Sequence, residues 1–168
     1  MLQVLRESKP GGHPSQNQAL AYLLIPLLKF AFTLSHGIVN EVYYPTEDVA
    51  CIRDMGLIVT DGKDFFSEEK RHCTHDIKML RKGIPAYRIS NTCIENKYQI
   101  TKEIITDPIR NTLLQNINFK STDKGTYKLF VLLAPHLNNQ GNNNTGWVFW
   151  KEANRWENKN FEVQVAEE

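Results

Sequence analysis

The residues best suited to bind a metal ion lie in one short segment, which contains His72, Cys73 and His75. If this segment is a β-strand, Cys73 and His75 share one face and His72 lies on the other. A structural zinc site usually has four ligands in two spaced pairs, and only Cys93 and His136 remain as distant candidates. We therefore predict no metal site and no cofactor.

Acidic residues could take part in acid–base chemistry. Hydrolysis of a glycosidic bond, for example, needs two carboxyl groups that face each other across the sugar. The candidates are Glu41, Asp48, Asp54, Asp61, Asp64, Glu68 and Glu69. The sequence alone places no two of them opposite one another, and acidic residues are usually found in turns and on surfaces. The sequence also lacks a Gly-rich phosphate loop, a nucleophile elbow and an HExxH motif. The sequence therefore identifies no catalytic pair among these residues.

Aromatic residues are the second class of candidate. Tyr43 and Tyr44 precede Pro45, and Trp147 is the first of the late tryptophans. Flat aromatic rings can stack on the apolar faces of sugar rings, although aromatic residues on strands more often belong to the core. If the chain has a sugar-binding surface, we expect Tyr43, Tyr44 and Trp147 to form it.

The composition excludes several classes of partner. The 168 residues include 20 basic and 19 acidic residues, so the formal net charge is +1. Because there is no basic stripe, we expect neither nucleic acid nor an acidic membrane surface as a partner. The most apolar run, residues 20–28, contains Pro26 and is shorter than the roughly 20 residues of a spanning helix. No clear signal peptide is present, so a cytoplasmic location is favoured over a secreted one.

The three cysteines, Cys51, Cys73 and Cys93, are widely and irregularly spaced. This pattern does not indicate a disulfide framework. We interpret all three as free and mostly buried thiols. The alternative is a single disulfide with one thiol left over.

Most of the chain has the pattern of an all-β protein, in which short runs of Val, Ile, Tyr, Phe and Thr are separated by turn residues. Asp61 and Gly62 lie between two such runs and predict a hairpin. Apolar and polar residues alternate in 98–104, where Lys102 interrupts the apolar face, as is common near a sheet edge. Residues 127–133 are apolar on both faces and predict a central strand.

Longer stretches resemble a known family. They are residues 32–45, 52–56, 58–62, 65–71, 87–89, 98–100, 102–108, 132–137 and 146–148. In order and spacing these stretches resemble the N-terminal domain of bacterial-type glucoamylases and glucodextranases, which belong to glycoside hydrolase family 15. The chain departs from the family at Ala31, where a tryptophan is usual.

The resemblance implies an antiparallel β-sandwich of the galactose-mutarotase-like (supersandwich) type. In the family this sandwich precedes an (α/α)6 barrel that carries both catalytic glutamates, so no catalytic residue is expected in this chain. We divide the chain into a flexible leader (1–28), the family-like sandwich (29–148) and a divergent tail (149–168). The sandwich is expected to be incomplete, because the family's domain is longer than this chain.

These expectations lead to three hypotheses for function. The first is a sandwich that supports a catalytic (α/α)6 barrel absent from this chain, with weak or indirect contact to α-glucan or maltooligosaccharide and no turnover of its own. The second is a stand-alone carbohydrate-binding module, and the third is a truncated product without independent function. An incomplete sandwich exposes strand edges and inner faces, so we also expect self-association or a need for a partner chain.

Overall fold

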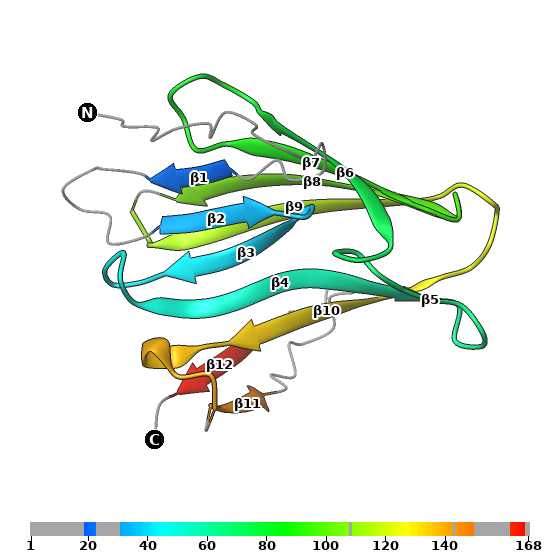
Figure 1. Cartoon of the computed structure of the whole chain (residues 1–168). Coiled ribbons are helices and arrows are strands. Elements are labelled where there is room, and N and C mark those ends of the chain that lie inside the picture. The colour runs from blue at the N-terminus through cyan, green and yellow to red at the C-terminus, as the bar shows by residue number, and fades with distance from the viewer. Residues whose placement is uncertain (1–18, 23–30, 108, 143, 150–161, 167–168) are drawn as a thin grey trace, which may run out of the picture.

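Nearly all regular structure in the computed structural model is β-strand, and the model describes residues 19–22, 31–107, 109–142, 144–149 and 162–166 (Figure 1). The strands are β1 (Ala19–Tyr22), β2 (Ala31–Ser35), β3 (Ile38–Tyr43), β4 (Ala50–Thr60), β5 (Phe66–Glu68), β6 (Cys73–Met79), β7 (Tyr87–Cys93), β8 (Tyr98–Asp107), β9 (Thr112–Ser121), β10 (Lys128–Pro135), β11 (Thr145–Phe149) and β12 (Glu162–Ala166). One 3₁₀ helix, η1 (Leu137–Asn139), follows β10. None of the described residues form a helix long and apolar enough to cross a membrane.

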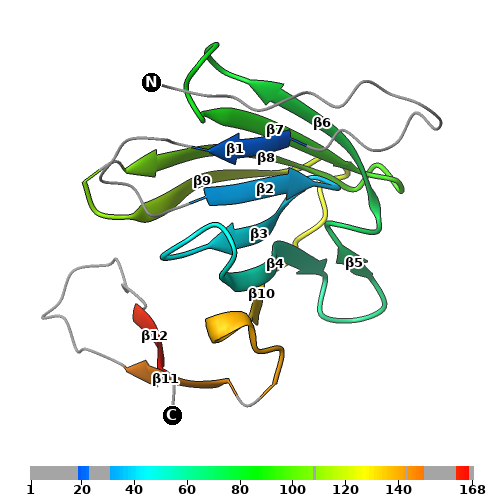
Figure 2. The ribbon, with the colours of Figure 1, turned by 60° about the vertical axis from the view of Figure 1, so that its left-hand side comes forward.

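The strands form two main sheets that lie face to face (Figures 1 and 2). The larger sheet has the order β1-β2-β3-β4-β10, and β5 also pairs with β4. The smaller sheet has the order β6-β7-β8-β9, and a separate hairpin joins β11 to β12. Every pairing among the described strands is antiparallel. The predicted all-β sandwich is therefore confirmed.

The core lies between the two sheets and consists of two clusters, because alternate residues of each strand point inward. The first cluster contains Phe32, Leu34, Val39 and Val42 of the larger sheet with Tyr87, Ile89 and Ile104 of the smaller one. The second contains Leu57, Val59, Phe65, Cys73, Cys93, Tyr98 and Ile100. Burial of this apolar area is the main force that holds the sheets together.

The predicted hairpin at Asp61 and Gly62 is confirmed. Strand β4 ends at Thr60, which pairs with Phe66 at the start of β5. The Asp61 carboxylate accepts hydrogen bonds from the backbone N–H groups of Lys63 (2.8 Å) and Phe65 (3.1 Å). These bonds stabilise the charged form and hold the pKa of the Asp61 carboxyl below its usual value.

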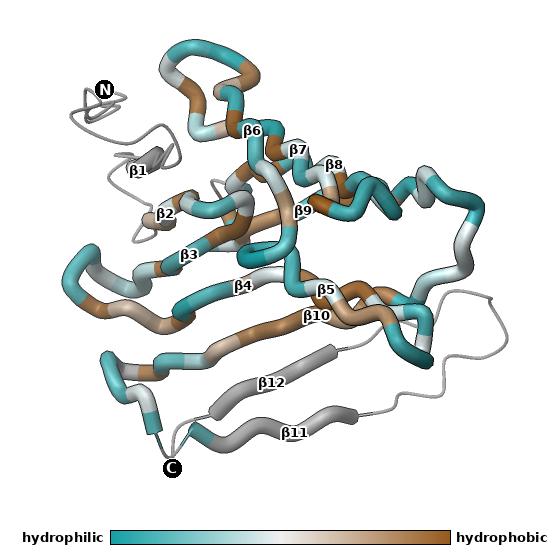
Figure 3. Tube along the Cα trace, turned by 45° about the vertical axis from the view of Figure 1, so that its right-hand side comes forward, coloured by the Kyte–Doolittle hydropathy of each residue, from teal (hydrophilic) through white to brown (hydrophobic). Residues whose placement is uncertain are grey.

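Two expectations about strand position are wrong for the described part of the chain. Lys102 lies on β8, which is an inner strand between β7 and β9, and its side chain is buried. Conversely, β10 ends the larger sheet, although its sequence predicted a central strand. Strand β10 is hydrophobic along most of its length (Figure 3), yet its side chains from Lys128 to Leu133 are exposed. An apolar sequence indicates that the side chains of a strand favour burial. It does not indicate which other strand, if any, covers them.

Candidate functional site

Of the three predicted sugar-binding residues, Tyr43 and Tyr44 are consecutive in the chain, and Trp147 lies on a separate hairpin. Tyr43 ends β3 and is half-buried, and its hydroxyl donates a hydrogen bond to Glu41 Oε2 (2.5 Å). Tyr44 follows the strand and exposes its ring. Trp147 lies on β11, which pairs with β12, and its side chain is outside the described part of the structure. A surface formed by all three stays a prediction.

The residues that resembled a metal site have separate local roles. His72 Nδ1 accepts a hydrogen bond from the backbone N–H of Glu68 (2.9 Å), and His136 Nδ1 lies 3.3 Å from the carbonyl oxygen of Ala50. His75 instead points at an asparagine of the neighbouring strand. Within the described ranges, no three His, Cys, Asp or Glu side chains converge as a metal site would require.

Most acidic candidates serve ion pairs rather than a catalytic pair. Glu41 lies 3.7 Å from the Arg53 guanidinium, and Asp54 lies 2.7 Å from the Lys70 ammonium. These carboxylates lie on or beside strands of the larger sheet and are partly exposed. Exposed ion pairs of this kind contribute about 0–1 kcal/mol each to the free energy of unfolding, so they add little stability.

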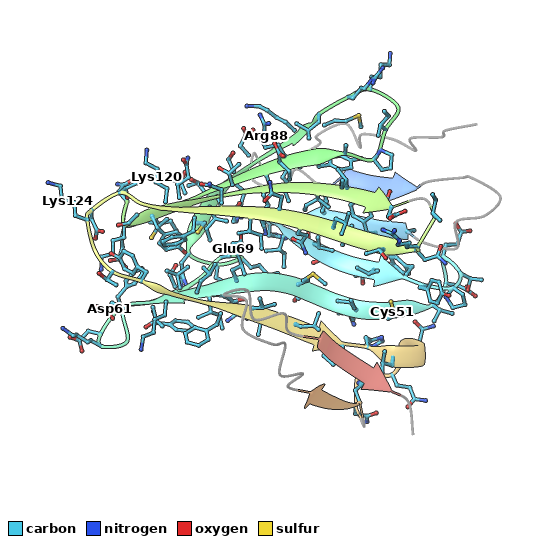
Figure 4. The ribbon with its side chains drawn as sticks, turned by 180° about the vertical axis from the view of Figure 1, so that it is seen from behind. Cys51, Asp61, Glu69, Arg88, Lys120 and Lys124 are labelled. Carbon is cyan, nitrogen blue, oxygen red and sulfur yellow. The ribbon has the colours of Figure 1, made fainter. Side chains whose placement is uncertain are left out.

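Glu69 differs from the other acidic residues because it is buried between the sheets (Figure 4). Its Oε1 atom lies 2.9 Å from Lys102 Nζ, and the side chains are 0% and 1% exposed respectively. Lys102 faces this carboxylate from β8, where its neighbours across the sheet are Ile89 and Ile117. Burial lowers the pKa of the Lys102 ammonium, and the Glu69 charge offsets part of that shift.

Asn91 connects this buried ion pair to the turn between β2 and β3. Its side-chain amide nitrogen donates hydrogen bonds to Glu69 Oε1 and to the backbone carbonyl of Gly37, the latter at 2.8 Å. Since the nitrogen serves both acceptors, Asn91 Oδ1 is left to accept a hydrogen bond from His75 Nδ1 (2.9 Å). We call Glu69, Lys102, Asn91, His75 and the Gly37 carbonyl the buried polar cluster. It links a turn of the larger sheet to the interior of the smaller one.

Sequence reasoning missed this cluster. The available signal was Lys102, a lysine on the apolar face of an otherwise regular strand. Such a residue needs a buried partner unless the strand lies at an edge, because an unpaired charge in the interior is very costly. Nothing in the local pattern indicates that Glu69 is that partner. Glu69 lies in the turn after β5 and Lys102 lies on β8, so only the fold brings the two side chains together.

Replacement of Gly37 by alanine should strongly destabilise the sandwich. Gly37 has φ +73°, and a Cβ atom there would lie 2.2 Å from Asn91 Oδ1 and 2.3 Å from His75 Nδ1. Left-handed backbone costs a non-glycine residue about 1–3 kcal/mol, and displacement of Asn91 would add the loss of its hydrogen bonds. Urea denaturation of Gly37→Ala measures the total loss.

Gly62→Ala is the matched control for this change. Gly62 also has a positive φ (+79°), but the nearest atom to its Cβ would be Lys128 Nζ at 3.5 Å, the end of a flexible side chain. This variant should show the backbone cost alone. Equal losses of unfolding free energy in the two variants would contradict a steric role for the contact between Gly37 and Asn91.

Comparison with known proteins agrees with this fold. Residues 15–160 match the family described as glucodextranase, domain N. A glucoamylase of Clostridium sp. (strain G0005) is 39% identical over 122 residues, which cover 71% of this chain and 17% of that protein. A solved bacterial glucoamylase complexed with acarbose superposes with a TM-score of 0.80 and 29% identity, covering 99% of this chain and 25% of that one. The chain thus spans a quarter or less of these relatives, and it belongs to the family of N-terminal β-sandwich domains of glucodextranases and glucoamylases.

Proposed function

We propose that this chain supports the catalytic barrel of a glucoamylase-like glycoside hydrolase and performs no hydrolysis by itself. The observation that carries the proposal is its match over 99% of its length to one quarter of a bacterial glucoamylase. The described residues form a β-sandwich, a hairpin and a short 3₁₀ helix, and they contribute nothing to an (α/α)6 barrel. The buried polar cluster and the ion pairs give most of the candidate acids structural partners, which fits a supporting role.

A chimera tests this role directly. The segment of the Clostridium glucoamylase that matches this chain would be replaced by the corresponding residues of this chain. We expect the chimera to release glucose from maltooligosaccharide at a rate close to that of the parent enzyme, whereas the isolated chain releases none. A folded chimera without activity, or hydrolysis by the isolated chain, would contradict the proposal.

We further infer weak contact between this chain and an α-glucan at Tyr44. Its ring is exposed, and the hydroxyl of the adjacent Tyr43 is held by Glu41. The bacterial glucoamylase of similar fold was solved as a complex with acarbose, so a glucan-like ligand is the natural probe. Trp147 belongs to this proposal as a third ring, on the strength of its position in the sequence.

In a calorimetric titration with maltotriose or acarbose, we expect binding in the millimolar range. Tyr44→Ala should weaken it about fivefold, because a ring contact contributes about 1 kcal/mol. Phe66→Ala is the control, since Phe66 is also an exposed ring but follows the opposite end of β4 (Figure 1). Absence of heat at millimolar sugar, or an equal loss in both variants, would exclude a glucan surface at Tyr44.

A further inference from the structure

The pairing of β6 with β7 places two of the three cysteines directly opposite each other. Cys73 is the register partner of Cys93. At the adjacent register position, the backbone N–H of Ile94 donates a hydrogen bond to the carbonyl oxygen of His72 (3.0 Å). Hydrogen-bonded and non-hydrogen-bonded pairs alternate along an antiparallel ladder, so Cys73 and Cys93 occupy a non-hydrogen-bonded pair.

This position has the backbone spacing that a disulfide needs. In a non-hydrogen-bonded pair the Cα atoms lie about 4.5 Å apart and the side chains approach closely. Disulfides span Cα–Cα distances of about 4.4–6.8 Å, so the strands would not have to move apart or change register. A cross-link between these residues is therefore compatible with the native sheet.

Both thiols also point the same way. Cys73 and Cys93 are buried in one core cluster, and Cys73 Sγ lies 3.3 Å from the Tyr98 hydroxyl. The third cysteine, Cys51, lies on β4 of the other sheet, where its thiol donates a hydrogen bond to the carbonyl oxygen of Val42 (3.3 Å). The fold thus separates Cys51 from the opposed pair, a choice that the spacing of the cysteines left open.

We propose that Cys73 and Cys93 form a cross-strand disulfide when the chain meets a small-molecule disulfide oxidant such as oxidised glutathione. One cysteine thiolate attacks the oxidant and releases one glutathione, which leaves a mixed disulfide on the protein. The second thiolate then attacks the protein sulfur of that mixed disulfide and releases the second glutathione. Two protein thiols are oxidised, one glutathione disulfide is reduced to two thiols, and Cys51 remains a thiol.

The cross-link would fasten an outer strand, since β6 ends the smaller sheet among the described strands. Reaction should be slow in the fully folded chain, because both sulfur atoms are buried. Burial also raises the pKa of the Cys73 thiol to about 11, which leaves little reactive thiolate near neutral pH. Opening of the outer strand is the step that admits the oxidant, so sub-denaturing urea should speed the reaction.

The test is to incubate the 168-residue chain with oxidised glutathione, with and without sub-denaturing urea, and then to count thiols after unfolding without reductant. We expect the count to fall from three to one. The intact mass should drop by two hydrogen atoms, and peptide mapping should join Cys73 to Cys93. The oxidised chain should unfold at a higher urea concentration than the reduced chain.

Variants separate the proposed pair from other linkages. Cys51→Ser should oxidise as the parent does, whereas Cys73→Ala and Cys93→Ala should form no intramolecular disulfide. The mapping on the unaltered chain decides the question even if a core variant fails to fold. A disulfide that includes Cys51 would overturn the proposal. So would three thiols that persist at a urea concentration at which hydrogen exchange shows that β6 opens.

Discussion

Lys102→Met should destabilise the sandwich by about 3–5 kcal/mol, because it leaves the Glu69 carboxylate buried without its cation. The carboxylate is inaccessible to water and lies 2.9 Å from the Lys102 ammonium. Its other contact is the hydrogen bond from Asn91, which is neutral and cannot replace the lost charge. Urea denaturation followed by circular dichroism measures this loss of unfolding free energy.

The double variant Glu69→Gln with Lys102→Met should recover much of that loss. Glutamine keeps an oxygen that can accept the hydrogen bond from Asn91, and neither new side chain carries a charge. Replacing a buried pair by neutral groups of similar volume is often neutral or stabilising, whereas breaking it is not. A strong coupling in this double-mutant cycle would assign the cost to the unpaired charge rather than to lost packing.

Arg88 on β7 and Glu103 on β8 supply the matched control, an exposed ion pair in the sheet that contains Lys102. Their side chains lie 2.6 Å apart, but both are exposed, and Arg88 points away from the sandwich (Figure 4). Arg88→Met should therefore change stability by at most about 1 kcal/mol. If Lys102→Met costs no more than Arg88→Met, the buried pair does not hold the structure in the way that its geometry indicates.

The isolated chain should self-associate through the side of the sandwich formed by β9 and β10. The register places Leu129, Val131 and Leu133 on the face of the larger sheet that carries the buried Leu57 and Val59. These β10 side chains are nevertheless exposed, and Val131 is 71% exposed.

The smaller sheet is open on the same side. Its last strand, β9, exposes Ile117, which lies beside the buried Lys102 on the inner face. Among the described strands, both sheets therefore end with an unpaired strand edge and an exposed apolar inner face, a combination that favours pairing with another chain.

Light scattering of the purified chain should give a mass above that of the monomer and rising with concentration. Val131→Lys should shift the population toward monomer, because a charge on the inner face opposes burial there. Ile94→Lys is the control, since Ile94 is 63% exposed but lies in the turn that follows β7. A monomeric chain with one cooperative melting transition would contradict this prediction, as would an equal effect of both lysines.

Local sequence patterns determined the elements of this fold. Alternation in residues 98–104 predicted β8, and Asp61 with Gly62 predicted the turn between β4 and β5. These features depend on neighbours within a few residues, which is why they can be read from the chain without its fold. The family resemblance extended them to a sandwich, which the strand pairings confirm.

The candidate sites were less accessible to sequence reasoning. Tyr43 and Tyr44 are candidates only because their aromatic rings suit sugar stacking. No sequence pattern joins them to Trp147, and the sugar-binding surface stays a prediction. The residues with metal-like spacing turned out to lie in separate local environments. The spacing of residues along the chain shows whether two ligands could share one face of a strand. It does not show which side chains a neighbouring strand places beside them.

The sequence by itself determined that the chain is all-β, where β8 and the turn between β4 and β5 lie, and to which family the domain belongs. Only the tertiary structure decided that Glu69 faces Lys102, that Cys73 lies opposite Cys93 and that β10 ends its sheet. The physical reason is that each of these facts depends on the register and order of strands far apart in the chain. A shift of one residue in register would turn every one of those side chains to the other face of its sheet.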